Sequence, residues 1–72
     1  MGNYVTYNSK IFGGKPIIKG TRISVEFVLE LLASGMSPEE IVKEYPQLTQ
    51  NDILAVFDYA AKTVKKEEVV LL

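Results

Sequence analysis

Cysteine, histidine and tryptophan are all missing from this sequence of 72 residues. Without cysteine no disulfide can form, and without cysteine or histidine there is neither a zinc site of the usual kind nor a Ser-His or Cys-His nucleophile pair. Carboxylates are then the only strong metal ligands. These absences make an enzyme the least favoured class, and we expect neither a metal nor a cofactor.

Long apolar runs are also missing, since none approaches the roughly 20 residues that span a bilayer. The sequence does not start with the charged, apolar and small-residue pattern of a secretory signal. We therefore expect a cytoplasmic protein that does not insert into a membrane. Residues 1–6 do fit the permissive template for N-myristoylation, so a lipid-anchored factor is kept as a minor alternative.

The length of the chain allows one domain, and a domain this small buries only about 60% of the surface that its unfolded chain exposes. Disulfides, a metal or a partner chain usually compensate for this. Hydrophobic residues make up 47% of the sequence, and with the five glycines they exceed the roughly 45–50% of an ordinary soluble domain. We therefore predict a homodimer that shares apolar surface.

Acidic residues are absent from the first 25 positions, which carry Lys10, Lys15, Lys19 and Arg22. Residues 26–60 hold seven acids against a single lysine, although the net charge of the chain is only −1. A basic arm before an acidic body can contact nucleic acid. The alternative is a structural role, in which lysines beside short strands block unwanted edge pairing. Because four cations are few, we favour this structural role over nucleic-acid contact.

Short β segments are predicted at the two ends of the chain. Residues 3–7 are β-branched and aromatic, and residues 15–19 form a short apolar segment after the Gly13-Gly14 turn signal. Pro16 cannot donate to a β ladder, so it belongs at a strand start or an edge. Residues 69–72 are a candidate short C-terminal strand.

The first predicted helix runs from a Ser24 cap through about Ser34 and stops at Gly35. Phe27 and Leu31 lie off its main apolar stripe, so the helix is apolar over most of its circumference and needs cover on a second side. In so short a chain, we expect another subunit to provide that cover. The stripe itself consists of Val25, Val28, Leu29 and Leu32.

Two more helices follow a recognisable pattern. Ser37-Pro38-Glu39-Glu40 is a capping box that starts a helix ending near Tyr45, because Pro46 disfavours helix in the residue before it. Thr49 and Asp52 form a weaker box before a third helix from Gln50 to about Val64. We expect this helix to pack through Ile53, Val56, Phe57, Ala60 and Val64. Two helices joined by a tight turn are typical of a helix-turn-helix.

The third helix would present Gln50 and Asn51 to base edges in such a motif. Its predicted exposed face offers one lysine against two aspartates, whereas DNA affinity comes largely from neutralised phosphates. We therefore expect this helix to be a poor major-groove reader. That face holds Asn51, Ala55, Asp58, Tyr59 and Lys62, with Asp52 beside them.

If DNA is bound, the predicted contacts are Lys15, Lys19 and Arg22 on the arm, doubled in a dimer. A salt bridge from Arg22 to Glu26 is the alternative role for the arginine. Simple solvation is the alternative for the two lysines.

Three stretches carry a family likeness: GGKPIIKGTRI at 13–23, LLASGMSPEEI at 31–41 and YPQLT at 45–49. Together they resemble the prokaryotic family called domain of unknown function 433, over about residues 11–64. Ser24 departs from the pattern, because members often have proline there, and both residues suit a helix start.

The resemblance implies a homeodomain-like helix-turn-helix over residues 38–64, with an N-terminal β-hairpin at 11–23 that takes part in dimerisation. It also implies an antitoxin-like role, because members are found beside small PIN-like nuclease toxins. The resemblance assigns no catalytic residues to this chain. The predicted fold is therefore mainly α: a hairpin arm at 1–23, three helices at 24–64 and a tail at 65–72.

Two functions remain open. The first is an antitoxin-like dimer that binds a PIN-like toxin and also DNA, the latter weakly. The alternative is a small dimeric protein-interaction module that never meets nucleic acid. The dimer is predicted to form through the N-terminal strands and the tail, with an interface of Tyr4, Val5, Ile17, Ile18, Phe27, Leu31, Val70 and Leu72.

Overall fold

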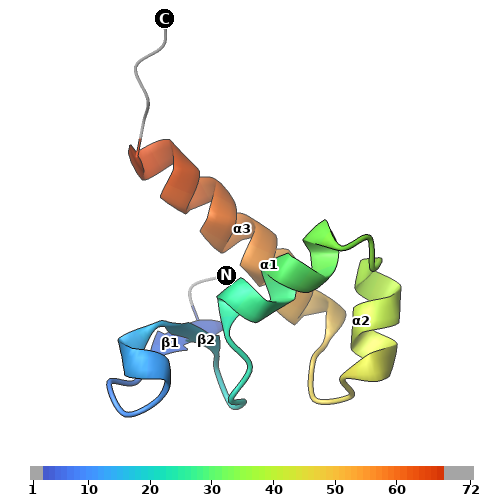
Figure 1. Ribbon diagram of the computed structural model, residues 1–72, viewed down its shortest axis with the longest axis horizontal. Helices are drawn as coiled ribbons and strands as arrows, with labels where there is room; N and C mark the ends of the chain where they lie inside the picture. Colours follow the sequence, from blue (N-terminus) through green and yellow to red (C-terminus); the bar gives the residue numbers. More distant parts are fainter. Residues whose placement is uncertain (1–2, 68–72) are drawn as a thin grey trace, which may run out of the picture.

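The computed structural model describes residues 3–67 and shows a mainly α fold with an N-terminal β-hairpin (Figure 1). The predicted fold class is confirmed. The candidate strand at 69–72 lies outside the described residues. The elements in chain order are β1 (Val5–Tyr7), the 3-10 turn η1 (Phe12–Gly14), β2 (Pro16–Ile18), α1 (Val25–Ala33), α2 (Pro38–Glu44) and α3 (Gln50–Glu67).

The hairpin pairs β1 with β2 in antiparallel register, with Val5 opposite Ile18 and Tyr7 opposite Pro16. Pro16 is the first residue of β2, a position at which proline, which has no N–H to donate, is tolerated in a β ladder. The hairpin at 11–23 that the family resemblance implied is wrong. That stretch supplies only β2 and the turn before it, whereas the first strand comes from the β-branched and aromatic segment at 3–7.

Helix α1 begins and ends where its capping residues predict. The Ser24 hydroxyl accepts a hydrogen bond from the Phe27 N–H at 2.9 Å. Gly35 follows the helix with a φ of 103°, in the left-handed region that favours glycine. Val25 and Val28 are buried, while Leu29, Leu31 and Leu32 are half-buried against the core.

Capping boxes start both α2 and α3. Ser37 accepts from the Glu40 N–H at 3.1 Å, and the Glu40 carboxylate accepts from the Ser37 N–H at 2.8 Å. Thr49 and Asp52 repeat the arrangement at 3.1 and 2.9 Å. Thr49 is exposed, but Asp52 is only 9% exposed, so the carboxylate of this second box is shielded from water.

The core gathers side chains from the second strand, all three helices and the turn before α3. Helix α3 is the longest element, and it continues three residues beyond the predicted end (Figure 1). Its N-terminal half packs on the rest of the molecule, whereas residues 61–66 are all exposed. The fully buried cluster consists of Ile18, Val25, Val28, Ile41, Leu48, Ile53 and Val56.

The face that α3 buries differs from the predicted one. Ile53 and Val56 are buried as expected, but Phe57 and Val64 are 47% and 66% exposed. Ala55, which was expected on the exposed face, is 2% exposed. Residues 53–57 are all apolar, so their pattern does not predict which face of the helix is buried. In the structure the buried face carries Ile53, Ala55 and Val56, and the larger Phe57 is exposed.

Candidate protein-binding surface

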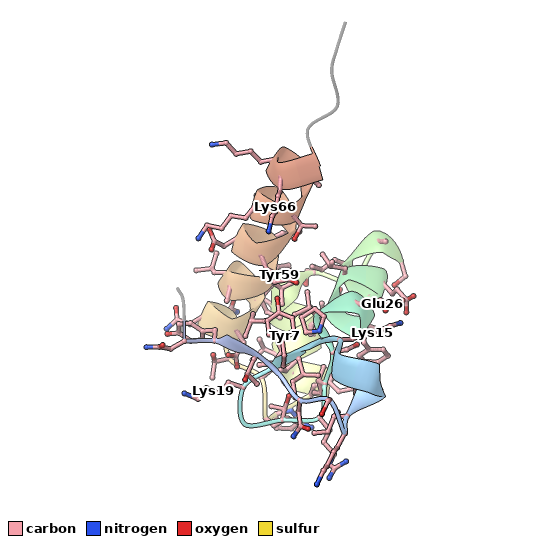
Figure 2. The ribbon with its side chains drawn as sticks, turned by 90° about the vertical axis from the view of Figure 1, so that its left-hand side faces the viewer. Tyr7, Lys15, Lys19, Glu26, Tyr59 and Lys66 are labelled. Carbon is pink, nitrogen blue, oxygen red and sulfur yellow. The ribbon has the colours of Figure 1, made fainter. Side chains whose placement is uncertain are left out.

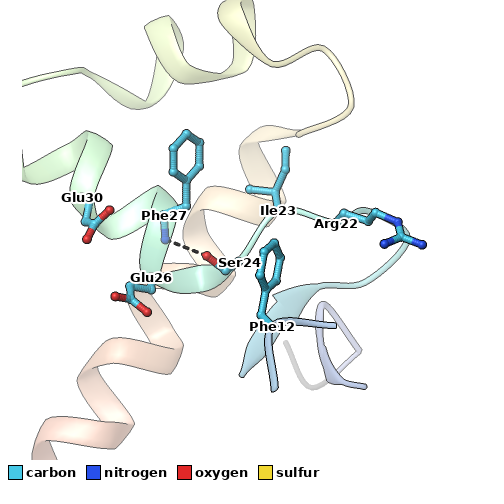
Figure 3. Close-up of a pocket in the computed structure, with 7 residues that line it drawn as sticks. All are labelled: Phe12, Arg22, Ile23, Ser24, Glu26, Phe27 and Glu30. Atoms are coloured by element: carbon cyan, nitrogen blue, oxygen red, sulfur yellow. Dashed lines mark hydrogen bonds between the residues drawn. The ribbon is translucent and has the colours of Figure 1, made fainter. Parts of the chain in front are cut away.

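A groove of about 310 Å³ lies between turn η1 and the start of α1 (Figure 3). Two phenylalanine rings and Ile23 form its apolar lining, and charged side chains flank them. Sites of this composition, with aromatic anchors and a polar rim, are typical of protein contacts. The residues that line it include Phe12, Arg22, Ile23, Glu26, Phe27 and Glu30.

Phe12 is held in the groove by an unusual backbone. Its φ is 51°, and Gly13 and Gly14 continue the left-handed conformation with φ of 64° and 86°. Glycine adopts this region freely, but for a phenylalanine it costs about 1–2 kcal/mol. The ring is nevertheless 54% exposed. Such strain is a feature of functional sites, where the surrounding fold maintains it.

Phe27 supplies the second ring from the first turn of α1, where Ser24 caps the helix at its N–H. The ring is 37% exposed and meets Tyr45 edge-to-face, with centroids 5.6 Å apart. This contact holds one side of the ring against the turn that follows α2 and leaves the other accessible. Phe27 was predicted as an interface residue because it lies off the main stripe of α1.

Charge is separated across the groove. Glu26 and Glu30 lie on the α1 side, and the Arg22 side chain extends away at the opposite end (Figure 3). The salt bridge from Arg22 to Glu26, which was the alternative to a DNA contact for this arginine, is not formed, because Arg22 precedes the helix and the four-residue helical spacing does not apply. Lys15 binds Glu26 instead at 2.9 Å. The hydrogen bond to Glu26 and its negative charge raise the pKa of Lys15.

Helix α3 presents a second apolar surface, which we call the α3 stripe and define as Leu54, Phe57, Ala61 and Val64. All four side chains are exposed, Leu54 to 53%. The stripe is flanked by a salt bridge of 3.0 Å between Asp58 and Lys62. The groove and the α3 stripe are therefore two separate exposed apolar surfaces, of the kind that in other proteins marks interaction sites.

A hydrogen bond between two tyrosine hydroxyls joins the hairpin to α3. The Tyr7 and Tyr59 oxygens are 2.8 Å apart, and Figure 2 shows the two rings meeting between strand and helix. The bond to Tyr7, together with partial burial, raises the pKa of Tyr59. The contact fixes the hairpin, and with it turn η1, relative to the helical body.

The predicted DNA contacts are not gathered into one basic patch. Lys15 is paired with Glu26, and Lys19 points to the other side of the hairpin in Figure 2. Gln50 and Asn51 are exposed at the start of α3, as predicted, but Leu54 follows them on the exposed surface.

The predicted dimer residues have mixed positions. Ile17 and Ile18 are 3% and 0% exposed in the chain's own core. Tyr4, Val5 and Leu31 are half-buried, and Val70 and Leu72 lie outside the described residues. Dimerisation through the N-terminal strands stays a prediction, and the part of it that involves residues 69–72 lies outside the described residues.

Sequence reasoning missed Phe12, Leu54 and Phe57 as surface residues. For Phe12 the signal was present, because an aromatic residue directly before Gly13-Gly14 stands in a turn and cannot easily be buried. For α3 the signal was ambiguous, since the helix has apolar residues on both faces.

A family model described as "Protein of unknown function (DUF433)" matches residues 5–60. This chain belongs to the DUF433 family. Among curated relatives, an uncharacterized protein named y4eO from Sinorhizobium fredii is 36% identical over 56 residues, which cover 78% of this chain and 25% of the relative. The chain therefore spans about a quarter of that protein's length.

A solved DUF433 structure gives the same fold. The crystal structure of a DUF433 member from Anabaena variabilis superposes with a TM-score of 0.79 at 28% identity, over 83% of this chain and 59% of that one. The family resemblance predicted from the sequence is therefore confirmed, while the helix-turn-helix assignment remains a prediction. Within residues 3–67, no helix has both the length and the apolar character needed to cross a bilayer.

Proposed function

We propose that this DUF433 protein is a non-enzymatic protein-binding module with an antitoxin-like role, and that its groove holds a segment of a PIN-like toxin. The observation that carries the proposal is the exposed Phe12 ring on a left-handed backbone, next to the half-exposed Phe27. A fold that maintains strain to expose an aromatic ring gains from it only when the ring is buried by a partner.

The charges of the groove define the partner segment. An apolar side chain fits between the two rings, a cation of the partner faces Glu30, and an acidic residue faces Arg22. Aromatic anchors in such sites carry most of the binding free energy, and the charged rim mainly governs specificity and association rate. The segment is therefore an apolar residue between a basic and an acidic one.

DNA contact by the hairpin is the second candidate function, supported by the exposed Lys19 and Arg22. It is weaker than protein binding, because Glu26 already neutralises Lys15 and the exposed surface of α3 is apolar. With so few phosphate contacts, any DNA affinity would be low and would fall steeply with added salt.

The test is co-expression of the tagged protein with the product of its neighbouring gene, followed by measurement of the complex by titration. We expect Phe12→Ala and Phe27→Ala each to weaken binding by about 30-fold or more. Phe57→Ala, a ring of similar exposure outside the groove, is the matched control and should leave the affinity within about threefold. Binding that is indifferent to both groove variants would refute the groove as the site.

A parallel titration uses duplex DNA from upstream of the same gene across a salt series. We expect at most weak binding, lost in Lys19→Glu and Arg22→Glu variants that still hold the protein partner. Tight, salt-resistant binding would instead make DNA the primary ligand.

A further inference from the structure

The ion pair between Lys15 and Glu26 lies at the acidic end of the groove, and the proposed function does not account for it. Lys15 follows turn η1 directly, and its Nζ atom lies 2.9 Å from a carboxylate oxygen of Glu26 on α1. Figure 2 shows the two side chains next to each other. Because Glu26 also lines the groove, the chain places a cation of its own on a carboxylate of the surface that a partner would cover.

Glu30 supplies a second carboxylate to the same end of the groove. It follows Glu26 by four residues, so the two are neighbours on the surface of α1, and both line the groove on that side (Figure 3). The hydrogen bond to Glu26, the charge of Glu26 and the charge of Glu30 all raise the pKa of Lys15, so its ammonium group lies in the field of both carboxylates. The exposed part of the Phe27 ring lies beside them, and aromatic rings attract cations. This end of the groove therefore suits a cationic side chain, and Lys15 already occupies part of it.

The contact that Lys15 makes is one that a stronger cation can replace. Its side chain is 60% exposed and that of Glu26 is 56% exposed, and ion pairs in such surroundings contribute little to stability. An arginine would bind more strongly than the lysine, because a guanidinium group donates two parallel hydrogen bonds to a carboxylate and stacks on an aromatic ring. The groove offers both kinds of contact at its α1 side.

We propose that Lys15 is an internal competitor for the groove, which occupies the carboxylates in the free protein and is displaced by an arginine of the partner segment. This inference rests on the proposed function, because it concerns the same groove, and it identifies the basic residue of the partner segment as arginine. A segment without a cation leaves the ion pair in place. Loss of Lys15 therefore strengthens the binding only of segments that carry the arginine.

An NMR titration of the isotope-labelled full chain with the peptide acetyl-Ala-Arg-Leu-Glu-Ala-amide tests the competition. We expect the peptide to shift the amide signals of residues 26–30 and to bind Lys15→Met about threefold more tightly than the natural chain. The same peptide with citrulline in place of arginine has a side chain of similar shape without the charge, and it should bind both chains equally. Lys19→Met is the matched control, because it removes a cation on the other side of the hairpin, and it should leave the affinity unchanged (Figure 2).

A double-mutant cycle separates displacement of Lys15 from a general effect of charge. In a Glu26→Gln background there is no ion pair to break, so Lys15→Met should no longer change the affinity for the arginine peptide. A gain that persists in this background would overturn the proposal. So would equal affinities of Lys15→Met and the natural chain, an equal gain with the citrulline peptide, or no shift of residues 26–30 at millimolar peptide.

Failure of the proposed function gives a different result. The product of the neighbouring gene would then bind Phe12→Ala and Phe27→Ala as tightly as the natural chain, whatever the effect of Lys15→Met on the peptide. If the groove is the site but Lys15 does not compete, the two phenylalanine variants weaken that complex while Lys15→Met leaves the peptide affinity unchanged.

Discussion

Replacement of Asp52 by alanine tests how much the burial of a capping box contributes to stability. The Asp52 carboxylate accepts a hydrogen bond from the Thr49 N–H at 2.9 Å and is 9% exposed. The same box at the start of α2 uses Glu40, which is exposed. The two boxes have nearly identical hydrogen-bond lengths, so the pair separates the effect of burial from that of geometry.

The expected losses follow from what replaces each carboxylate. In Glu40→Ala, the hydrogen bond that is lost is accepted by an exposed carboxylate, and the loss is about 0.5 kcal/mol. In Asp52→Ala, the lost acceptor is a charged carboxylate that is shielded from water, and its interaction with the helix dipole is lost with it, for a total of about 2 kcal/mol. For a domain of this size, about 2 kcal/mol lowers the Tm by roughly 8–16 °C.

Urea and thermal unfolding followed by circular dichroism, at one fixed protein concentration, measure both changes. Asp52→Asn keeps an acceptor oxygen at the same place and serves as the control, with an expected loss below about 1 kcal/mol. Equal losses for Glu40→Ala and Asp52→Ala would show that the burial of Asp52 contributes nothing to stability, and would refute the prediction.

Two further predictions concern the turn after α1 and the tyrosine pair. Gly35→Ala forces a side chain into a φ of 103° although the space around it is open, so unfolding experiments should show a loss of about 1–2 kcal/mol from backbone strain alone; an unchanged Tm would contradict this. The raised pKa of Tyr59 means that the folded state keeps its proton to higher pH than the unfolded state. Its stabilising contribution is therefore complete below about pH 10 and is lost as pH rises through the folded pKa. Tyr7→Phe should lower the pKa of Tyr59 in a tyrosinate absorbance titration, and an unmoved pKa would exclude the hydrogen bond as its cause.

Local signals in the sequence predicted the helix boundaries well. Ser24, Gly35 and the box at Ser37 and Glu40 act on groups within four residues of themselves, so their identity alone fixes what they do. Strand β1 was also predicted from its own residues. The hairpin range of 11–23, which came from the family resemblance and not from these residues, was wrong.

The sequence did not predict which side chains would be buried or paired by contacts between distant segments. Residues 53–57 of α3 are apolar without interruption, and only the packing of α1 and α2 selects Ile53 and Val56 over Phe57 for the core. The partner of Glu26 is likewise a tertiary outcome, since Lys15 arrives from the hairpin eleven residues away. The groove is a tertiary feature as well, because Phe12 and Phe27 line it together only where the hairpin packs on α1.

Two copies of this chain, as in the homodimer expected from the sequence, would carry two grooves formed by Phe12 and Phe27. A partner that carries two matching segments on a flexible linker would meet the second groove at an effective concentration in the millimolar range. Such an assembly would convert the weak binding of each groove into strong avidity, without a single additional contact.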